Sequence, residues 1–191
     1  MGNGNLQGLR IAILVTDGFE QVELEKPRAA LDEAGADTIV VSPKDKTVLG
    51  MNHIDKGDEF IVDQQIEHAD PDDFDAVLLP GGVVNADTLR MDAAARRFVQ
   101  ACQASGRPIA VICHGPWLLV SAGLVKGRHL TSYHTVQDDI RNAGGIWTDE
   151  QMVLDKNWVS SRKPDDIPAF NKAMINLFAK IKEKSKSAGR S

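Results

Sequence analysis

Apolar residues along the chain fall into two kinds of stretch. The first kind is short and mostly apolar, at residues 9–15, 74–79 and 109–112, and it is rich in Val, Ile and Leu. Runs of this composition are typical of strands that are buried on both faces of a parallel sheet. The second kind, at 20–34 and 87–106, repeats its apolar residues at helical spacing. The alternation predicts an α/β fold: a three-layer α/β/α sandwich with a mostly parallel central sheet.

The remaining elements follow from shorter signals. Gly35 ends the first helix, and a strand at 38–42 completes a strand–helix–strand unit with a right-handed crossover. Residues 44–62 carry turn signals and short apolar pairs, which indicate a small antiparallel excursion. The rest is predicted as a short helix and loop at 64–73, strands at 130–132, 146–147, 152–154 and 158–161, and helices at 136–143 and 165–182.

Composition limits the class of protein. The 191 residues are 42% hydrophobic, which fits one domain over residues 9–183, between an extended or disordered N-terminus (1–8) and a basic flexible tail (184–191). The net charge of −5 argues against a nucleic-acid partner. No stretch has membrane-spanning length, and no secretory signal opens the chain. Two cysteines make no disulfide framework, so a cytoplasmic setting is expected.

The residues after the third strand carry the main chemical signal. Cys113 follows Ile112 directly, and Gly115 and Pro116 precede a second apolar run. Pro suits the first position of a helix, and Gly lets backbone pass close by, so the pattern predicts a sharp strand-to-helix bend with Cys113 at its tip. This is the geometry of a nucleophile elbow, and the helix start favours a thiolate there. The alternative is a buried core cysteine without a chemical role.

Two other strand ends carry polar or glycine-rich segments. After the first strand, Glu20 and Glu23 share a helix face, and Glu23 is one turn further in. If Glu23 is buried, we expect it to stay protonated and to donate a hydrogen bond to the sulfur. The alternative is that Glu20 and Glu23 are both solvated carboxylates on the helix surface. Gly81 and Gly82 form either a plain tight turn or an oxyanion hole, in which a glycine amide joins that of His114.

The histidines show no metal-ligand spacing. Because neighbouring side chains at a turn usually diverge, we expect His114 to be a base toward Cys113 only if the backbone is distorted, and otherwise a supporting residue. No metal site and no cofactor are predicted. The remaining histidines are interpreted as surface or loop residues: His53, His68, His129 and His134.

Five motifs resemble the PfpI intracellular proteases, which belong to the superfamily that includes the parkinsonism-associated deglycase. They are L-P-G-G, A-V-I-C-H-G-P, G-R-x-L-T-S-Y, D-D-I-x-N-A-G and N-W-V-S-S-R-x-P-x-D, and the similarity runs from about Leu9 to Phe178. The resemblance implies a flavodoxin-like fold shared with class I glutamine amidotransferases. The His-x-Glu that completes the amidotransferase triad is missing after Cys113, which disfavours glutaminase chemistry.

The resemblance also implies roles for single residues. Cys113 matches the nucleophile, Glu23 the acidic residue that contacts its sulfur, and Gly82 and His114 the oxyanion-hole amides. Tyr133 matches a tyrosine that lines the same pocket, with Glu20 and Gly81 beside it. In the archaeal proteases a glutamate from a neighbouring subunit completes the histidine, and in this sequence the shorter Asp87 stands at that place.

The function implied is a stress-related, cysteine-dependent enzyme that acts on carbonyl carbon. The leading hypothesis is deglycase or glyoxalase activity on methylglyoxal or its adducts with proteins or nucleotides, and the second is intracellular peptide hydrolysis. A redox-sensing or chaperone-like protein that uses an oxidisable Cys113 is the alternative from another class. The family also implies a homo-oligomer, a dimer or hexamer, with the site at a subunit interface.

Overall fold

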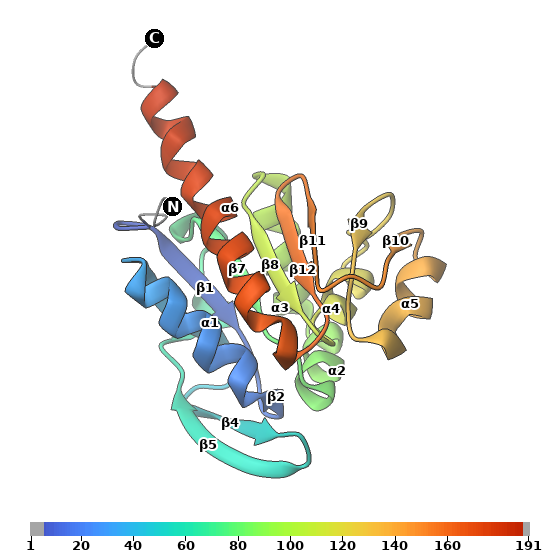
Figure 1. Ribbon diagram of the computed structural model, residues 1–191. Coiled ribbons are helices and arrows are strands. Elements are labelled where there is room, and N and C mark those ends of the chain that lie inside the picture. Colours follow the sequence, from blue (N-terminus) through green and yellow to red (C-terminus); the bar gives the residue numbers. More distant parts are fainter. Residues whose placement is uncertain (1–5, 189–191) are drawn as a thin grey trace.

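A seven-stranded sheet forms the centre of the computed structural model, which describes residues 6–188 (Figure 1). The strand order is β11-β12-β8-β7-β1-β3-β6, and all neighbours are parallel except β11, which pairs antiparallel with β12. The mostly parallel sheet predicted from the sequence is therefore confirmed. Its strands are β1 (Arg10–Leu14), β3 (Asp37–Ser42), β6 (Gln64–Gln65), β7 (Ala76–Leu79), β8 (Ile109–Ile112), β11 (Met152–Asp155) and β12 (Trp158–Ser161).

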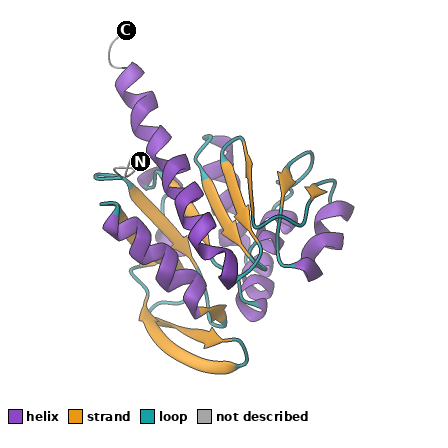
Figure 2. Ribbon diagram, in the orientation of Figure 1, coloured by secondary structure: helices purple, strands orange, loops and turns teal. Residues whose placement is uncertain are grey.

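Helices cover both faces of this sheet, as the colouring by secondary structure makes clear (Figure 2). Helices α1 and α6 pack against each other on one face, and α3 lies on the other face with α2 and α4 beside it (Figure 1). The helices are α1 (Gln21–Glu33), α2 (Val83–Met91), α3 (Ala93–Ala104), α4 (Pro116–Ser121), α5 (Gln137–Asn142) and α6 (Ile167–Ala188).

Alternation along each strand produces two separate cores. Ile11 and Ile13 of β1 belong to the core under α1 and α6, whereas Ala12 and Leu14 belong to the core under α3. Successive side chains of a strand point to opposite faces, so a strand with helices on both sides must be apolar at every position. This is the physical reason for the mostly apolar runs in the sequence.

A small three-stranded sheet borders the carboxyl end of the central one. It consists of β2 (Phe19–Glu20), β4 (Thr47–Asn52) and β5 (Asp55–Ile61), of which β4 and β5 form the antiparallel excursion predicted for residues 44–62. The Gln21 side chain fixes this hairpin to α1, because its Oε1 accepts from the Asp58 backbone N–H (2.7 Å) and its Nε2 donates to the Asp58 carboxylate (2.8 Å). A further pair, β9 (His129–Leu130) and β10 (Ile146–Trp147), is parallel.

The structure corrects three details of the sequence interpretation. The helix predicted over 87–106 is two helices, α2 and α3, because the Asp92 side chain caps α3 by accepting from the Ala95 N–H (2.8 Å). Leu6, predicted in a loose N-terminus, is buried in the core, while residues 1–5 lie outside the described part. The closing helix continues to Ala188, so residues 184–188 of the predicted tail are helical, and 189–191 are not described.

None of the helices within residues 6–188 is both long and apolar enough to cross a membrane.

Asp92→Ala is expected to destabilise the protein by about 1 kcal/mol, because the cap that separates α2 from α3 loses its acceptor. The free energy of unfolding from urea denaturation measures this. Asp45→Ala, at an exposed loop position, is the matched control and is expected to change stability by less than about 0.5 kcal/mol. Equal effects of the two substitutions would contradict the capping role.

Candidate active site

Three strand ends meet at one edge of the central sheet. Strands β1, β7 and β8 are adjacent in the sheet, with Ile13 in register with Leu78 and Leu78 with Ala110. Since all three run in the same direction, the segments that follow them converge beyond their carboxyl ends, where open α/β sheets bind ligands. This brings together the predicted site segments around Glu20, Gly81 and Cys113.

Cys113 lies at a bend whose backbone conformation is unusual. Its φ is 61°, in the left-handed region that non-glycine residues rarely adopt. Two backbone hydrogen bonds fix the bend: the Cys113 N–H donates to the Ser161 carbonyl (3.1 Å), and its carbonyl accepts from Tyr133 (2.9 Å). A Cβ on Gly115 would lie 2.8 Å from the Leu79 carbonyl oxygen, so the predicted need for glycine there is confirmed. Helix α4 then begins at Pro116, as predicted.

The Glu23 carboxyl is fully buried beside this bend. Its Oε2 accepts from the Gly81 N–H (2.8 Å), and its Oε1 has no hydrogen bond of standard geometry among the described residues. Burial raises the pKa of Glu23 to about 8, against the opposing effects of the Gly81 amide and the Cys113 thiol. Glu23 is therefore mostly protonated at neutral pH and able to donate, as the sequence predicts for a buried residue at this position.

The glycines after β7 allow the carboxyl and the sulfur to approach each other. A Cβ on Gly81 would lie 2.5 Å from Glu23 Oε2 and 2.6 Å from the Cys113 Cβ. Gly82 has a φ of 89°, and a Cβ there would collide with the Gly18 carbonyl oxygen and the backbone of β2. These two positions accept no larger residue without a shift of the surrounding backbone.

The sulfur is surrounded by groups with opposing effects. Burial raises the pKa of the Cys113 thiol well above its ordinary value, and the Glu23 carboxyl adds to this effect, whereas the N–H groups of Gly82 and His114 lower it. Helix α4 has only six residues, so its dipole is weak. Burial and the Glu23 carboxyl act against the expectation that the helix start holds the sulfur ionised, and that expectation stays a prediction.

His114 contacts the sulfur directly, contrary to the expectation that neighbouring side chains diverge. Its Nδ1 lies 3.2 Å from Cys113 Sγ, and its Nε2 lies 3.2 Å from Thr135 Oγ1. Burial lowers the pKa of His114 to about 4, with a smaller effect from His134, so the ring is neutral at pH 7. The left-handed conformation of Cys113 is the distortion that lets both side chains point the same way.

Glu23, Cys113 and His114 line a cavity of about 920 Å³. Of the predicted pocket residues, Glu20 and Tyr133 line it and Gly81 does not, because Gly81 lies against Glu23 and Cys113 behind the wall. Gly82 also lines it, and the Tyr133 ring stacks on His114 with centroids 4.8 Å apart. At the hairpin tip, the His53 N–H donates to Glu20 Oε2 (3.2 Å). The wall also includes residues that sequence analysis did not select: Gly18, Met51, His53, Ile54, Trp117, Thr135 and Lys163.

These additional wall residues come from segments far apart in the chain, which explains why sequence analysis missed them. Thr135 stands two positions after Tyr133, and that proximity is the one local signal for it. His53 is exposed at a turn, as predicted for the remaining histidines, and nothing in its neighbourhood of the sequence relates it to Cys113. The hairpin brings it to the cavity only in three dimensions.

Asp87 lies apart from this cluster within the chain. It is exposed on α2, and its side chain makes no hydrogen bond or ion pair with any residue from 6 to 188. No carboxylate of the described chain lies within ion-pair distance of His114. The role of Asp87 in a neighbouring subunit stays a prediction, as do the oxyanion-hole roles of Gly82 and His114.

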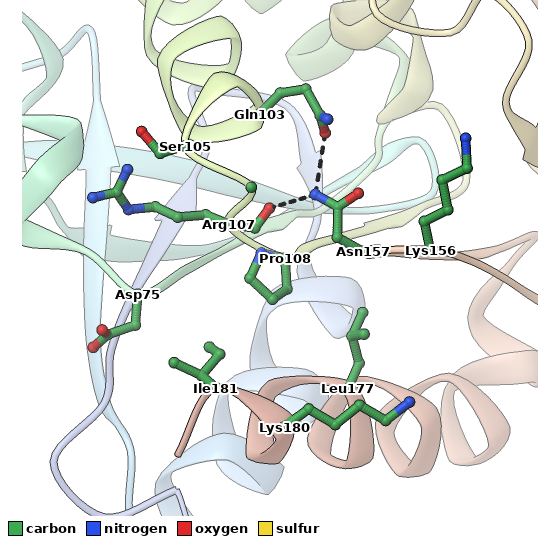
Figure 3. A pocket seen from close by; sticks show the side chains of 11 residues that line it. Asp75, Gln103, Ser105, Arg107, Pro108, Lys156, Asn157, Leu177, Lys180 and Ile181 are labelled. Atoms are coloured by element: carbon green, nitrogen blue, oxygen red, sulfur yellow. Dashed lines mark hydrogen bonds between the residues drawn. The ribbon is translucent and has the colours of Figure 1, made fainter. Parts of the chain in front are cut away.

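A second cavity, of about 690 Å³, lies at the opposite end of the sheet (Figure 3). Pro108 and Asn157, which precede β8 and β12, line it together with Leu177 of α6. The Asn157 amide donates to Gln103 (3.2 Å) and to the Arg107 carbonyl (2.9 Å), so its polar groups are engaged in holding the loops together (Figure 3). Neither Cys102 nor Cys113 lines this cavity.

The sequence matches known proteins over most of its length. The model of the DJ-1/PfpI family matches residues 9–177. A deglycase of Pyrococcus abyssi is 40% identical over 169 residues, which are 88% of this chain and 99% of the relative. YraA of Bacillus subtilis, provisionally named a cysteine protease, is 38% identical over 169 residues, covering 88% of this chain and 97% of the relative.

Among solved structures, a two-domain protein of Anabaena variabilis has a TM-score of 0.83 at 30% identity. It contains DJ-1/ThiJ/PfpI-like and ferritin-like domains, and the match covers 88% of this chain and 47% of that chain.

Glu23→Gln is expected to change how stability depends on pH. Between about pH 4.5 and pH 8 the folded protein holds a proton on Glu23 that an unfolded chain has released, so folding loses stability as pH rises through this window. The shift corresponds to at most roughly 5 kcal/mol. Glutamine binds no such proton, so the unfolding free energy of Glu23→Gln, measured by urea denaturation, should rise relative to that of the unmodified protein from about pH 5 to pH 8.

Glu33→Gln, at an exposed position of the same helix, is the control for this measurement. Its unfolding free energy is expected to follow that of the unmodified protein at every pH. A Glu23→Gln curve that runs parallel to both would mean that the carboxyl is ionised in the folded protein.

Proposed function

The chain belongs to the DJ-1/PfpI family, and from this premise we propose that it is a cysteine-dependent enzyme acting on the carbonyl carbon of methylglyoxal and of its adducts with protein amines. The observation that carries the proposal is the cluster of Cys113, Glu23 and His114 in the 920 Å³ cavity. Two similar proteins point the same way, since one is named a deglycase and the other is provisionally named a cysteine protease. A reducing, cytoplasmic setting is part of the proposal, because a free Cys113 thiol is the reactive group.

The first step is attack of the Cys113 sulfur on the aldehyde carbon. His114 Nδ1, 3.2 Å from Sγ, accepts the thiol proton as the S–C bond forms, and the π electrons of the carbonyl move to its oxygen. The N–H groups of Gly82 and His114 lie near the sulfur and are available to that oxygen. Protonation of the oxygen completes a hemithioacetal.

The second step moves hydrogen within the adduct. Loss of the proton on C1 and its return at C2 convert the hemithioacetal into a thioester of lactate, and water then releases lactate and the thiol. Methylglyoxal plus water thus gives lactate with no external oxidant or reductant. A hemiaminal adduct first reverts to the aldehyde: its C–N bond breaks, its hydroxyl proton moves to the nitrogen, and the free amine leaves. The released methylglyoxal then follows the same sequence. The protonated Glu23 carboxyl donates toward the sulfur whenever negative charge develops there.

The surroundings of His114 favour aldehydes over peptide bonds. Peptide hydrolysis requires a histidine that holds a proton for the leaving amine, and a neighbouring carboxylate usually stabilises that imidazolium. In the described chain no carboxylate pairs with His114, and burial lowers the pKa of the ring to about 4. Addition to an aldehyde needs no protonation of a nitrogen leaving group, so the weak base suffices.

The same residues also bear on the redox-sensing alternative. A sensor thiol reacts with peroxide as the thiolate, and burial raises the pKa of Cys113, which slows that reaction. A donor such as Glu23 would nevertheless stabilise a sulfinate once formed. Selective oxygen addition at Cys113 after mild peroxide, found by mass spectrometry in a protein with no turnover, would favour this alternative.

Cys113→Ala is expected to abolish lactate release from methylglyoxal, because no other residue can form the thioester. The measurement is lactate production against time, with reversal of methylglyoxal-modified peptides as a second substrate. Cys102→Ala is the matched control, since Cys102 is the other free, buried cysteine and lies away from the cavity. Equal rates for Cys113→Ala and the unmodified protein would exclude the proposed enzyme.

We also propose that the protein is a homo-oligomer with the site beside a subunit interface. Three exposed apolar side chains support this, since Ile54 is 90% exposed, Val83 53% and Val84 59%, and all three line the candidate cavity. Asp87 is exposed on the same helix as Val83, and this exposure supports the proposal that it contacts a neighbouring subunit.

Ile54→Lys is expected to weaken this association and to lower activity, while Cys113 stays intact. Light scattering after size-exclusion chromatography gives the mass, and lactate release gives the activity of the same fractions. Ile61→Lys, 73% exposed at the other end of β5 and outside the cavity wall, is the control and should keep the native mass. A fully active monomer would refute the interface proposal.

A further inference from the structure

The two nitrogens of the His114 ring face different partners. Nδ1 lies 3.2 Å from Cys113 Sγ, and Nε2 lies 3.2 Å from Thr135 Oγ1. Tyr133 stacks on the ring at 4.8 Å with an interplanar angle of 28°, and Trp117 meets it edge-on at 5.2 Å. Because these aromatic contacts hold the ring plane, the remaining variable is which nitrogen carries the proton.

Thr135 supplies the hydroxyl that contacts Nε2, and the contact is compatible with a proton on either partner. A hydroxyl both donates and accepts, and Thr135 is exposed, so its own hydrogen can go to solvent while its oxygen accepts from Nε2–H. With the proton on Nε2, the lone pair of Nδ1 points toward the sulfur. With the proton on Nδ1, the ring could donate to the sulfur and could not take its proton.

We propose that Thr135 is a positioning residue that holds His114 in the Nε2–H tautomer, so that Nδ1 accepts the proton of the Cys113 thiol. The inference rests on the proposed function, in which His114 is the base for attack on an aldehyde. It adds a residue that neither the sequence motifs nor the carboxylate expected from a neighbouring subunit supplies.

Within one subunit, the polar side chain in contact with His114 Nε2 is the Thr135 hydroxyl and not a carboxylate. The titratable groups beside the ring are Cys113, Tyr133 and His134, so no negative charge of the described chain stabilises an imidazolium. His114 therefore passes the thiol proton to the developing alkoxide rather than keeping it. The S–C bond forms, the carbonyl π bond breaks, and the proton ends on oxygen, which is the balance of hemithioacetal formation. The substrate class that fits is a free or readily released aldehyde.

The test compares Thr135→Val, which removes the hydroxyl at nearly constant shape, with Thr135→Ser, which keeps it. Chemical shifts of the ring nitrogens in ¹⁵N-labelled protein report the tautomer of each histidine. The chain supplies a matched control, because Thr148 Oγ1 lies 3.2 Å from His129 Nε2 outside the cavity. Thr148→Val removes the same kind of hydrogen bond at the surface.

The expected result has three parts. The unmodified protein shows His114 as the Nε2–H tautomer, and Thr135→Val shifts it toward a mixture of tautomers. Because only the Nε2–H fraction of His114 can act as the base, a mixture of tautomers should lower kcat for methylglyoxal by about two- to fivefold, with KM changed by less than about 1.5-fold. Thr135→Ser should retain most of the activity, and Thr148→Val should alter neither kcat nor the tautomer of His114.

Two outcomes would overturn the inference: a His114 that carries its proton on Nδ1 in the unmodified protein, or a Thr135→Val variant with unchanged kcat. The rate of Cys113 alkylation by iodoacetamide, followed by mass spectrometry, separates this failure from failure of the proposed function. If the unmodified protein releases no lactate but Thr135→Val slows alkylation and shifts the tautomer, the positioning role stands and the substrate assignment falls. If lactate is released and Thr135→Val changes neither the tautomer nor the alkylation rate, the substrate assignment stands and the positioning role falls.

Discussion

The left-handed backbone conformation of Cys113 is the constraint on which the site depends. A residue held in this region costs of order 1–3 kcal/mol, and it persists only where surrounding contacts impose it. Here β12 and the segment after β9 impose it through backbone hydrogen bonds to Ser161 and from Tyr133. The bend carries the sulfur out of the strand direction, toward the carboxyl of α1 and the imidazole of the next residue. Relaxing the bend would separate all three groups.

Desolvation sets the protonation states at this bend. Glu23, His114 and Cys113 are each 7% exposed or less, and burial disfavours the charged form of every one of them. The result is a neutral acid, a neutral imidazole and a thiol, which are arranged so that one proton can move among them. A short helix at the bend is too weak a dipole to reverse this. In the proposed mechanism the nucleophile is therefore generated at the moment of attack, with His114 as the base.

The fold separates the parts that hold the chemistry from those that shape the cavity. The nucleophile, the acid and the glycine turn follow adjacent strands of a sheet that is buried on both faces, so their relative positions are rigid. The outer wall comes from the β4–β5 hairpin and from residues beyond β9. The hairpin is joined to the rest of the protein through β2 and through side chains such as Gln21. In the proposed enzyme, these loop and hairpin segments would contact the parts of the substrate away from the reacting carbon.

The sequence by itself determined the architecture and the identity of the reactive groups. Burial on both faces forces apolar runs into the strands, and the Cys-His-Gly-Pro turn requires specific residue types, so both are visible as local patterns. It did not determine the split of α2 from α3, the contact between Cys113 and His114, or the place of Thr135 and His53 in the cavity wall. Those depend on a positive φ and on segments distant in the chain meeting in space. The protonation states were likewise decided by tertiary structure, because desolvation depends on what surrounds a group rather than on its neighbours in sequence.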